Sequence, residues 1–316
     1  MIRNIFLLLA LMLALSGCGG VPQEKPPKPD AESPFAVLTD QSNRQVIFKS
    51  KPTHFAVTSA GFLEPLHEFG AEIVGRPDSR TQMPEWARDI ASIGQVYQID
   101  VERLIACRPD LVIINKGMNE KLLGVLEENG IKAMVLDMKS YDAFKRVIRT
   151  FAILTENEAR GEEMIADMNQ RIEAVVERIP KEKRRVAILH STAQGLSVQL
   201  EGSIAGWIVN RLGWTNVAEG MTPLEHNPDA APYSMETLAE QNPEIIFVTS
   251  MGPIDEIKYD MQAMIAENPA WQSIEAIREG RIYFLPQDLF LLSPGLRYPE
   301  AVEMMANLIY PTEEAK

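Results

Sequence analysis

Short apolar runs alternate with stretches of helical spacing along most of this chain, and this alternation constrains the fold more than any other feature. The runs expected to form strands are 55–58, 72–74, 111–114, 133–136, 186–189, 245–248 and 282–285. The stretches expected to form helices are 63–69, 100–107, 120–129, 203–212, 235–239 and 300–308. Leu111–Ile114 is wholly apolar, as expected for a strand covered on both faces. The alternation predicts α/β layers with largely parallel sheets.

The alternation falls into two blocks, and a different kind of segment separates them. Thr155 and Glu158 have the spacing of a capping box, with Thr155 as the expected N-cap. Apolar residues then recur at helical spacing until Pro180, over about 23 residues or roughly 34 Å of helix. We therefore expect two Rossmann-like α/β lobes, 34–154 and 181–316, joined by a single long helix over 155–180. One large doubly wound domain with a long crossover helix is the alternative.

The N-terminus has the features of an exported chain. Arg3 precedes an unbroken apolar run, Ile5–Leu15, which is shorter than the about 20 residues that a membrane span needs. A short basic start followed by such a run is typical of a secretory signal peptide. The run ends in Leu15-Ser16-Gly17-Cys18, which resembles the bacterial lipobox. The resemblance implies removal of residues 1–17 and lipidation of Cys18; an ordinary cysteine beside a cleavage site is the alternative.

A proline-rich segment follows Cys18. Four prolines stand among charged residues between Gly19 and Ser33, a composition that cannot bury a core and favours an extended tether over 18–33. Several acyl chains on one cysteine give stable anchoring, whereas a single chain is marginal. We therefore expect an exported protein that is lipid-anchored to the cell membrane, on its extracytoplasmic face or in the periplasm.

Charge and residue usage exclude several function classes. The chain has 31 Lys and Arg against 44 Asp and Glu, a net charge of −13, and no basic stripe, which argues against nucleic-acid binding. Its two cysteines, Cys18 and Cys107, provide neither a disulfide framework nor a thiolate metal cage. The four histidines lack the HExxH spacing, and no G-x-S-x-G elbow or P-loop occurs. We expect neither an enzyme nor an intrinsic cofactor.

Several short segments carry a resemblance through their order and spacing. They are Thr39-Asp40, Gly61–Gly75, Ile93-Gly94, Arg108–Val112, Gly213–Val217, Ser234–Leu238, Asn242–Val248 and Asn268–Trp271. Together they resemble the iron-complex and cobalamin family of ABC-importer substrate-binding proteins over about residues 36–312. The resemblance implies a class III periplasmic-binding-protein fold, with its helical connector. It also implies an ABC permease and its ATPase as partners, a small-molecule metal chelate as ligand, and a monomer.

The topology predicts where a ligand binds. In open α/β sheets ligands bind beyond the carboxyl ends of the strands, so the post-strand loops of both lobes predict the cleft. These loops are 59–62, 76–79, 94–98, 115–118, 137–141, 190–196, 249–253 and 287–297. They offer aromatic surface from Phe62 and Tyr141, and the cations Arg76 and Arg297 for a carboxylate of the ligand. This set suits a bulky, partly apolar, anionic chelate better than a bare metal ion.

The stretch 75–112 resembles the haem-binding lipoproteins of Gram-positive haem importers. The positions that match their Met and His iron ligands are Tyr97 and Met251, and both of these residue types occur as haem ligands. Haem is the favoured cargo; a ferric siderophore or a cobalamin-type corrinoid is the alternative. Tyr97 as a stacking residue and Met251 as a packing residue are the other readings, and His226 is the reserve ligand.

Glu64 occupies the place of the first-lobe glutamate with which this family docks on permease arginines. Glu201, just before a helix, is the candidate for the second docking charge, and a solvated surface charge is the alternative for both. Two other function classes stay open. A chelatase-like enzyme on the same plan would need a titrating base, which the sequence does not place. A structural or adhesive surface lipoprotein would hold no ligand.

Overall fold

The computed structural model describes residues 33–79, 83–192, 195–250 and 254–311. The predicted signal peptide, Cys18, the tether up to residue 32 and Met251 lie outside the described residues. Residues 34–316 form one compact unit. It begins with an antiparallel hairpin of β1 (Ala36–Thr39) and β2 (Gln45–Phe48).

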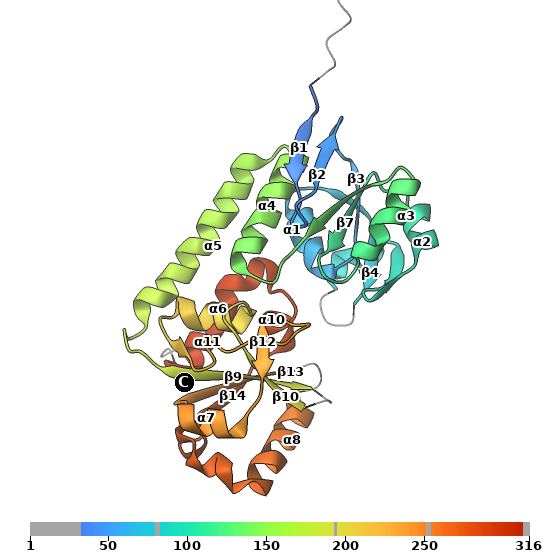
Figure 1. Ribbon diagram of the computed structural model, residues 1–316. Helices are drawn as coiled ribbons and strands as arrows, with labels where there is room; N and C mark the ends of the chain where they lie inside the picture. The colour runs from blue at the N-terminus through green and yellow to red at the C-terminus, as the bar shows by residue number, and fades with distance from the viewer. Residues whose placement is uncertain (1–32, 80–82, 193–194, 251–253, 312–316) are drawn as a thin grey trace, which may run out of the picture. The chain divides into compact units, whose positions relative to one another are not determined.

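The first lobe is built on a six-stranded sheet in the order β6-β5-β4-β3-β7-β8 (Figure 1). All neighbouring pairs are parallel except β5 and β6. The strands are β3 (His54–Val57), β4 (Glu72–Asp78), β5 (Ser92–Gln95), β6 (Gln98–Ile99), β7 (Leu111–Asn115) and β8 (Lys132–Leu136). The helices are α1 (Leu63–Glu68), α2 (Val101–Ala106), α3 (Leu123–Glu128) and α4 (Tyr141–Thr155).

Both faces of this sheet are covered, as the wholly apolar run Leu111–Ile114 in β7 predicts. Leu111 and Ile113 belong to one buried cluster, with Phe62 and Phe144, whereas Val112 and Ile114 belong to another. Successive strand residues point to opposite faces, so one strand contributes to two cores. The sheet is therefore an interior layer, and ligands reach it at the strand ends.

The second lobe holds a sheet in the order β12-β10-β9-β13-β14, with β11 paired to β9. Here β9, β11, β13 and β14 run parallel, and β10 is antiparallel to β9 and β12. The strands are β9 (Arg185–Thr192), β10 (Gly195–Gln199), β11 (Thr215–Asn216), β12 (Ala230–Pro232), β13 (Ile245–Ser250) and β14 (Ile282–Phe284). The helices are α6 (Ile204–Arg211), α7 (Met235–Gln241), α8 (Ile254–Glu267), α9 (Glu275–Arg278), α10 (Gln287–Phe290) and α11 (Tyr298–Ile309).

A single long helix, α5 (Glu158–Arg178), leads from the first lobe to the second and packs against α4 and α11 (Figure 1). The predicted fold class, two α/β lobes joined by one long helix, is confirmed. The start of that helix was predicted wrongly. Thr155 is not an N-cap but the last residue of α4, and its hydroxyl donates to Phe151 O at 2.7 Å. The break between the helices falls at Glu156, whose φ is +60°.

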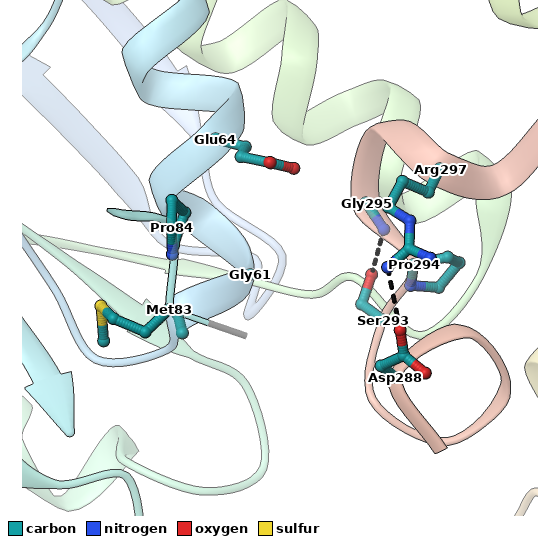
Figure 2. A pocket seen from close by; sticks show the side chains of 10 residues that line it. Gly61, Glu64, Met83, Pro84, Asp288, Ser293, Pro294, Gly295 and Arg297 are labelled. Atoms are coloured by element: carbon teal, nitrogen blue, oxygen red, sulfur yellow. Dashed lines mark hydrogen bonds and ion pairs between the residues drawn. The ribbon is translucent and has the colours of Figure 1, made fainter. Parts of the chain in front are cut away.

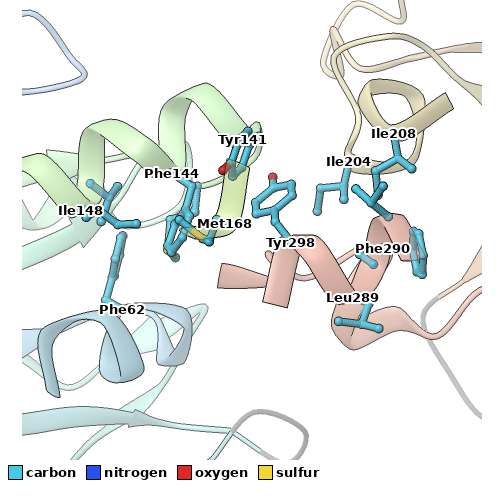
Figure 3. Packing of buried hydrophobic residues seen from close by; sticks show 14 of the residues in the cluster. Phe62, Tyr141, Phe144, Ile148, Met168, Ile204, Ile208, Leu289, Phe290 and Tyr298 are labelled. Carbon is cyan, nitrogen blue, oxygen red and sulfur yellow. The ribbon is translucent and has the colours of Figure 1, made fainter. Parts of the chain in front are cut away.

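Three rings from three helices meet where the lobes adjoin. Tyr141 of α4 lies 5.0 Å from Trp207 of α6 and 5.0 Å from Tyr298 of α11, between ring centroids. Figure 3 shows Tyr141 and Tyr298 facing each other, with Phe144 and Ile204 close by. We call Tyr141, Trp207 and Tyr298 the aromatic seam. Burial raises the pKa of the Tyr141 and Tyr298 hydroxyls, so both stay protonated.

Candidate functional site

The carboxyl ends of the first-lobe strands open into a cavity of about 330 Å³, which we call the apolar cavity. From the first lobe it is lined by Ser59, Ala60, Gly61, Ser79, Val96, Tyr97, Asn115, Met118, Met138 and Lys139. From the second lobe it is lined by Ile204, Leu291, Leu292 and Ser293. It lies where the topology of parallel strands places a ligand, and most of its large side chains are apolar.

Two smaller cavities adjoin the apolar cavity because they share lining residues with it. The polar cavity, about 160 Å³, is lined by Lys139, His190, Gln199, Gly202, Ser203, Ile204, Asn227, Asp229, Ala230, Phe290 and Leu291. The outer cavity, about 180 Å³, is lined by Ala60, Gly61, Glu64, Met83, Pro84, Asp288, Ser293, Pro294, Gly295 and Arg297 (Figure 2). Together the three form one cleft lined by both lobes.

Tyr97 is well placed for a ligand. Tyr97 stands in the turn between β5 and β6, is 70% exposed, and lines the apolar cavity. The turn is held from behind by Asn119, which is fully buried and donates from Nδ2 to Val96 O at 2.8 Å. Gly94, with φ +95°, allows the tight approach to Gln98 O, which a Cβ would meet at 2.9 Å. The phenol is therefore presented on a fixed turn.

The two other aromatic residues predicted for the cleft lie in the core, which corrects that prediction. Phe62 is fully buried and packs edge-on against Phe151, with 6.1 Å between ring centroids. Tyr141 is 3% exposed and belongs to the aromatic seam. Neither lines any of the three cavities. Each sits at the start of a helix, and its ring packs against residues of neighbouring helices.

The two predicted arginines are occupied by the protein itself. Arg76 donates to Ala87 O at 3.1 Å, to Arg88 O at 2.9 Å and to Asp78 Oδ1 at 3.0 Å, and it lines none of the cavities. Arg297 lines the outer cavity but binds both carboxylate oxygens of Glu300, at 2.7 and 2.8 Å, and Asp288 Oδ2 at 2.9 Å. The Glu300 carboxylate, with Asp288, raises the pKa of Arg297. Neither guanidinium is left uncompensated.

The predicted docking charges differ in their surroundings. Glu64 is exposed on α1, and Figure 2 shows its carboxylate pointing across the outer cavity toward the segment with Gly295 and Arg297. Glu201 is half-buried, and its Oε1 is buried with no hydrogen-bond partner among the described residues. His226 is exposed in the loop before β12 and lines none of the three cavities.

His190, near the end of β9, was not singled out from the sequence, although it directly follows the predicted strand 186–189. With the Thr249 hydroxyl assigned as the donor to Leu189 O at 3.3 Å, its oxygen accepts from His190 Nδ1 at 3.1 Å. Burial lowers the pKa of His190, which keeps the imidazole neutral at pH 7. Its remaining nitrogen, Nε2, carries the lone pair, and the ring lines the polar cavity.

Three further polar residues of this cavity were also missed. Gln199 is 6% exposed, and its Oε1 has no hydrogen-bond partner among the described residues. Lys139 of the first lobe places Nζ 3.9 Å from Oδ2 of Asp229 of the second. These residues come from three separate segments, so no sequence motif marks them. Within the described ranges, no group of three or more His, Cys, Asp or Glu is placed to hold a metal ion.

Residues 57–289 match the model of a family described as periplasmic binding protein. The chain belongs to this family. Members are substrate-binding components of ABC importers and are not enzymes, which removes the chelatase alternative. In the part of the chain that the structure describes, no helix combines the length and the apolar character needed to cross a membrane.

Relatives of this periplasmic binding protein span nearly its whole length. The Fe(3+)-citrate-binding protein YfmC of Bacillus subtilis is 21% identical over 313 residues, covering 95% of this chain and 94% of the relative. The high-affinity heme uptake system protein IsdE of Staphylococcus aureus is 22% identical over 274 residues, covering 86% and 90%. An ABC transporter substrate-binding protein from Listeria monocytogenes has a TM-score of 0.73 at 23% identity, covering 83% of this chain and all of that structure.

Proposed function

We propose that this periplasmic binding protein is the extracytoplasmic receptor of an ABC importer for an iron chelate, with haem as the favoured cargo. One observation carries the proposal. The cavity at the strand ends is lined from both lobes by large apolar side chains, among them Val96, Met118, Met138, Leu291 and Leu292. A flat macrocycle buries two apolar faces, and each Å² removed from water contributes about 25 cal/mol.

Tyr97 is the iron ligand that the geometry favours. Its exposed phenol stands at the apolar cavity, and a phenolate oxygen is a hard donor that suits ferric iron. Met251 remains the proposed second ligand on the strength of the sequence, with His226 in reserve. The name of the relative IsdE, a haem uptake protein, supports haem.

A ferric siderophore or a corrinoid is the second candidate cargo, and one observation favours it. Arg76 and Arg297, the cations expected to receive haem carboxylates, already bind protein carboxylates and carbonyls. A chelate without carboxylates needs neither arginine.

We further propose that Cys18 carries the lipid anchor and that 18–33 is the tether that follows signal peptide 1–17. The lobes are then 34–154 and 181–316 about the connecting helix. The acylated chain delivers its cargo to a permease with an attached ATPase, and Glu64 is the docking charge of the first lobe. Glu201 is a weaker second docking charge because one of its oxygens is buried.

The absorption spectrum of the full chain as purified tests the cargo. We expect a Soret band, and saturable growth of that band when hemin is added to the stripped protein. A colourless protein that does not bind hemin, but whose tryptophan fluorescence is quenched by a ferric siderophore, would overturn haem as the cargo. The proposed role in chelate transport would then still stand. A protein that binds no chelate at all overturns the proposed function.

A further inference from the structure

We propose that the polar cavity is a second subsite of the cleft, which receives a hydrogen-bond-donating substituent of the chelate, a primary amide or a hydroxyl, in preference to a carboxylate. The inference rests on the proposed function, because it takes the chelate to lie in the apolar cavity. The two cavities share Lys139, Ile204 and Leu291, so a substituent of a bound chelate can reach from one into the other.

Gln199 supplies the first reason. It is the last residue of β10, it is more than nine-tenths buried, and it lines the polar cavity. Its Oε1 is buried without a partner among the described residues. A buried amide oxygen without a hydrogen bond is costly. A donor on the ligand would satisfy this oxygen, and a carboxylate would not.

His190 supplies the second reason, from the neighbouring strand β9. Because the Thr249 hydroxyl proton is directed at Leu189 O, Nδ1 of His190 carries the proton that it shares with Thr249 Oγ1. Burial keeps the ring neutral, so Nε2 is an acceptor. No described residue bonds Nε2. The cavity therefore offers a second fixed acceptor.

Asp229 supplies a third acceptor, in a fixed place. Its Oδ1 lies against Gly202, where a Cβ would come within 2.3 Å. Lys139 stands 3.9 Å from Oδ2 and balances its charge. A ligand carboxylate would have to compete with Asp229 for Lys139 while lying beside the Gln199 and His190 acceptors. An uncharged donor meets no such conflict.

The charged residues that line the whole cleft support the same inference. Among the described residues that line the three cavities, Arg297 is the one guanidinium, and two carboxylates already bind it. Asp229 adds negative charge to the same lining. A carboxylate-rich chelate therefore finds no uncompensated arginine in this lining. A chelate with amide or hydroxyl groups at its edge fits better, so within the proposed function this inference favours the second candidate cargo over haem.

The test compares chelates that share a core and differ at the edge. Hemin carries two propionates, and hemin bis-amide carries the same groups as primary amides. We expect the full-length protein to bind the bis-amide about tenfold more tightly than hemin, by fluorescence quenching. Gln199→Leu should remove most of this preference while changing the affinity for hemin by less than about twofold. Gln241→Leu, on α7 and outside the three cavities, is the matched control.

Gln199→Glu separates the donor requirement from simple packing. It keeps the size of the side chain and adds charge, so it should retain the bis-amide and weaken hemin further. Melting temperatures of all variants identify any that are not folded.

Equal or tighter binding of hemin than of its bis-amide overturns the inference and leaves haem delivery intact. So does a preference that survives in Gln199→Leu. A hemin spectrum that loses an iron ligand in His190→Phe also overturns it, because Nε2 would then bind metal. If ferric citrate is bound and the others are not, the inference fails and chelate transport stands. If hemin, its bis-amide, cyanocobalamin, ferric citrate and a ferric siderophore all fail to bind, the proposed function fails and the inference falls with it.

Discussion

The hydroxyl of Tyr141 on α4 lies 2.9 Å from Oδ1 of Asn169 on the connecting helix α5 and donates a hydrogen bond to it. The same ring packs on Trp207 and Tyr298 of the second lobe. The connector is thus tied to the first lobe in its middle, and α11 packs along it from the second lobe. A connecting helix that is held along its length differs from a hinge, in which a few loop residues absorb the change in backbone torsion angles.

We therefore expect only a small closure on ligand binding. X-ray scattering of the full chain with and without bound chelate should give radii of gyration that agree within error. A clear decrease in the radius of gyration on binding would contradict the stiff connector.

Tyr141→Phe removes the hydrogen bond to Asn169 and should lower the free energy of unfolding by about 1 kcal/mol, measured by urea denaturation. Tyr259→Phe, at an exposed site on α8, should have no effect.

Asp40 should make stability fall at low pH. Its side chain is buried and accepts hydrogen bonds from Ser42 N, Arg44 and Val135 N. Burial alone raises the pKa of Asp40, but the hydrogen bonds outweigh it and hold the pKa below the usual value. Because the unfolded chain then binds the proton more tightly, this stabilisation is complete above about pH 4 and is lost as the pH falls through the lower folded pKa.

Asp40→Asn tests this dependence. It should lower the free energy of unfolding at pH 7 by about 3 kcal/mol, because the Arg44 guanidinium loses its buried partner. The variant should also show a flatter loss of stability as the pH falls below about 4. Asp89→Asn, at an exposed position, is the control. Parallel acid unfolding curves for Asp40→Asn and the unmodified chain would refute the assignment.

Glu64→Arg should leave chelate affinity unchanged and abolish uptake by cells. Exposed charges steer and register a partner more than they stabilise the fold. Uptake of labelled chelate and binding by the purified protein are measured side by side. Glu128→Arg, at an exposed position on α3 of the same lobe, is the control and should transport normally. A loss of ligand binding in Glu64→Arg would show that the Glu64 carboxylate contributes to ligand binding rather than to docking.

If haem is the cargo, Tyr97→Ala should weaken hemin binding by more than about tenfold and shift the absorption spectrum more than Met251→Ala does. The phenolate is the harder donor for ferric iron, whereas a thioether alone binds it weakly. Arg297→Gln should change neither the affinity for hemin nor the spectrum, because Glu300 and Asp288 already bind the guanidinium. Tyr259→Ala is the control. Hemin binding with an unchanged spectrum in both Tyr97→Ala and Met251→Ala would transfer the ligand role to His226.

The strands that the sequence predicted best are those whose residues are apolar throughout, such as Leu111–Ile114 and Ile245–Val248, because a strand covered on both faces has no polar positions. The helix α4 was missed for a local reason. It passes into α5 through Glu156, a non-glycine residue with positive φ, and such a residue leaves no mark in the sequence. The antiparallel strands β10 and β12 were also missed, because they are short and depend on pairing with their neighbours in the sheet.

The position of the cleft could be predicted from the sequence, but the side chains that line it could not. Parallel strands bring their carboxyl ends to one edge, so the cleft follows from topology alone. Which side chains reach it depends on packing: Tyr97 does, whereas Tyr141 turns into the seam. The partners of Arg76 are backbone carbonyls at 87 and 88, which no side-chain pattern reveals.

The lining of the apolar cavity comes mainly from turns after strands, whereas the aromatic seam comes from three helices. The residues that line the cavity and the residues that couple the two lobes thus lie in different parts of the chain. A substitution in a turn can change what is carried without disturbing how the lobes are held together. Replacements in the turns can then alter the lining of the cavity while the aromatic seam stays unchanged.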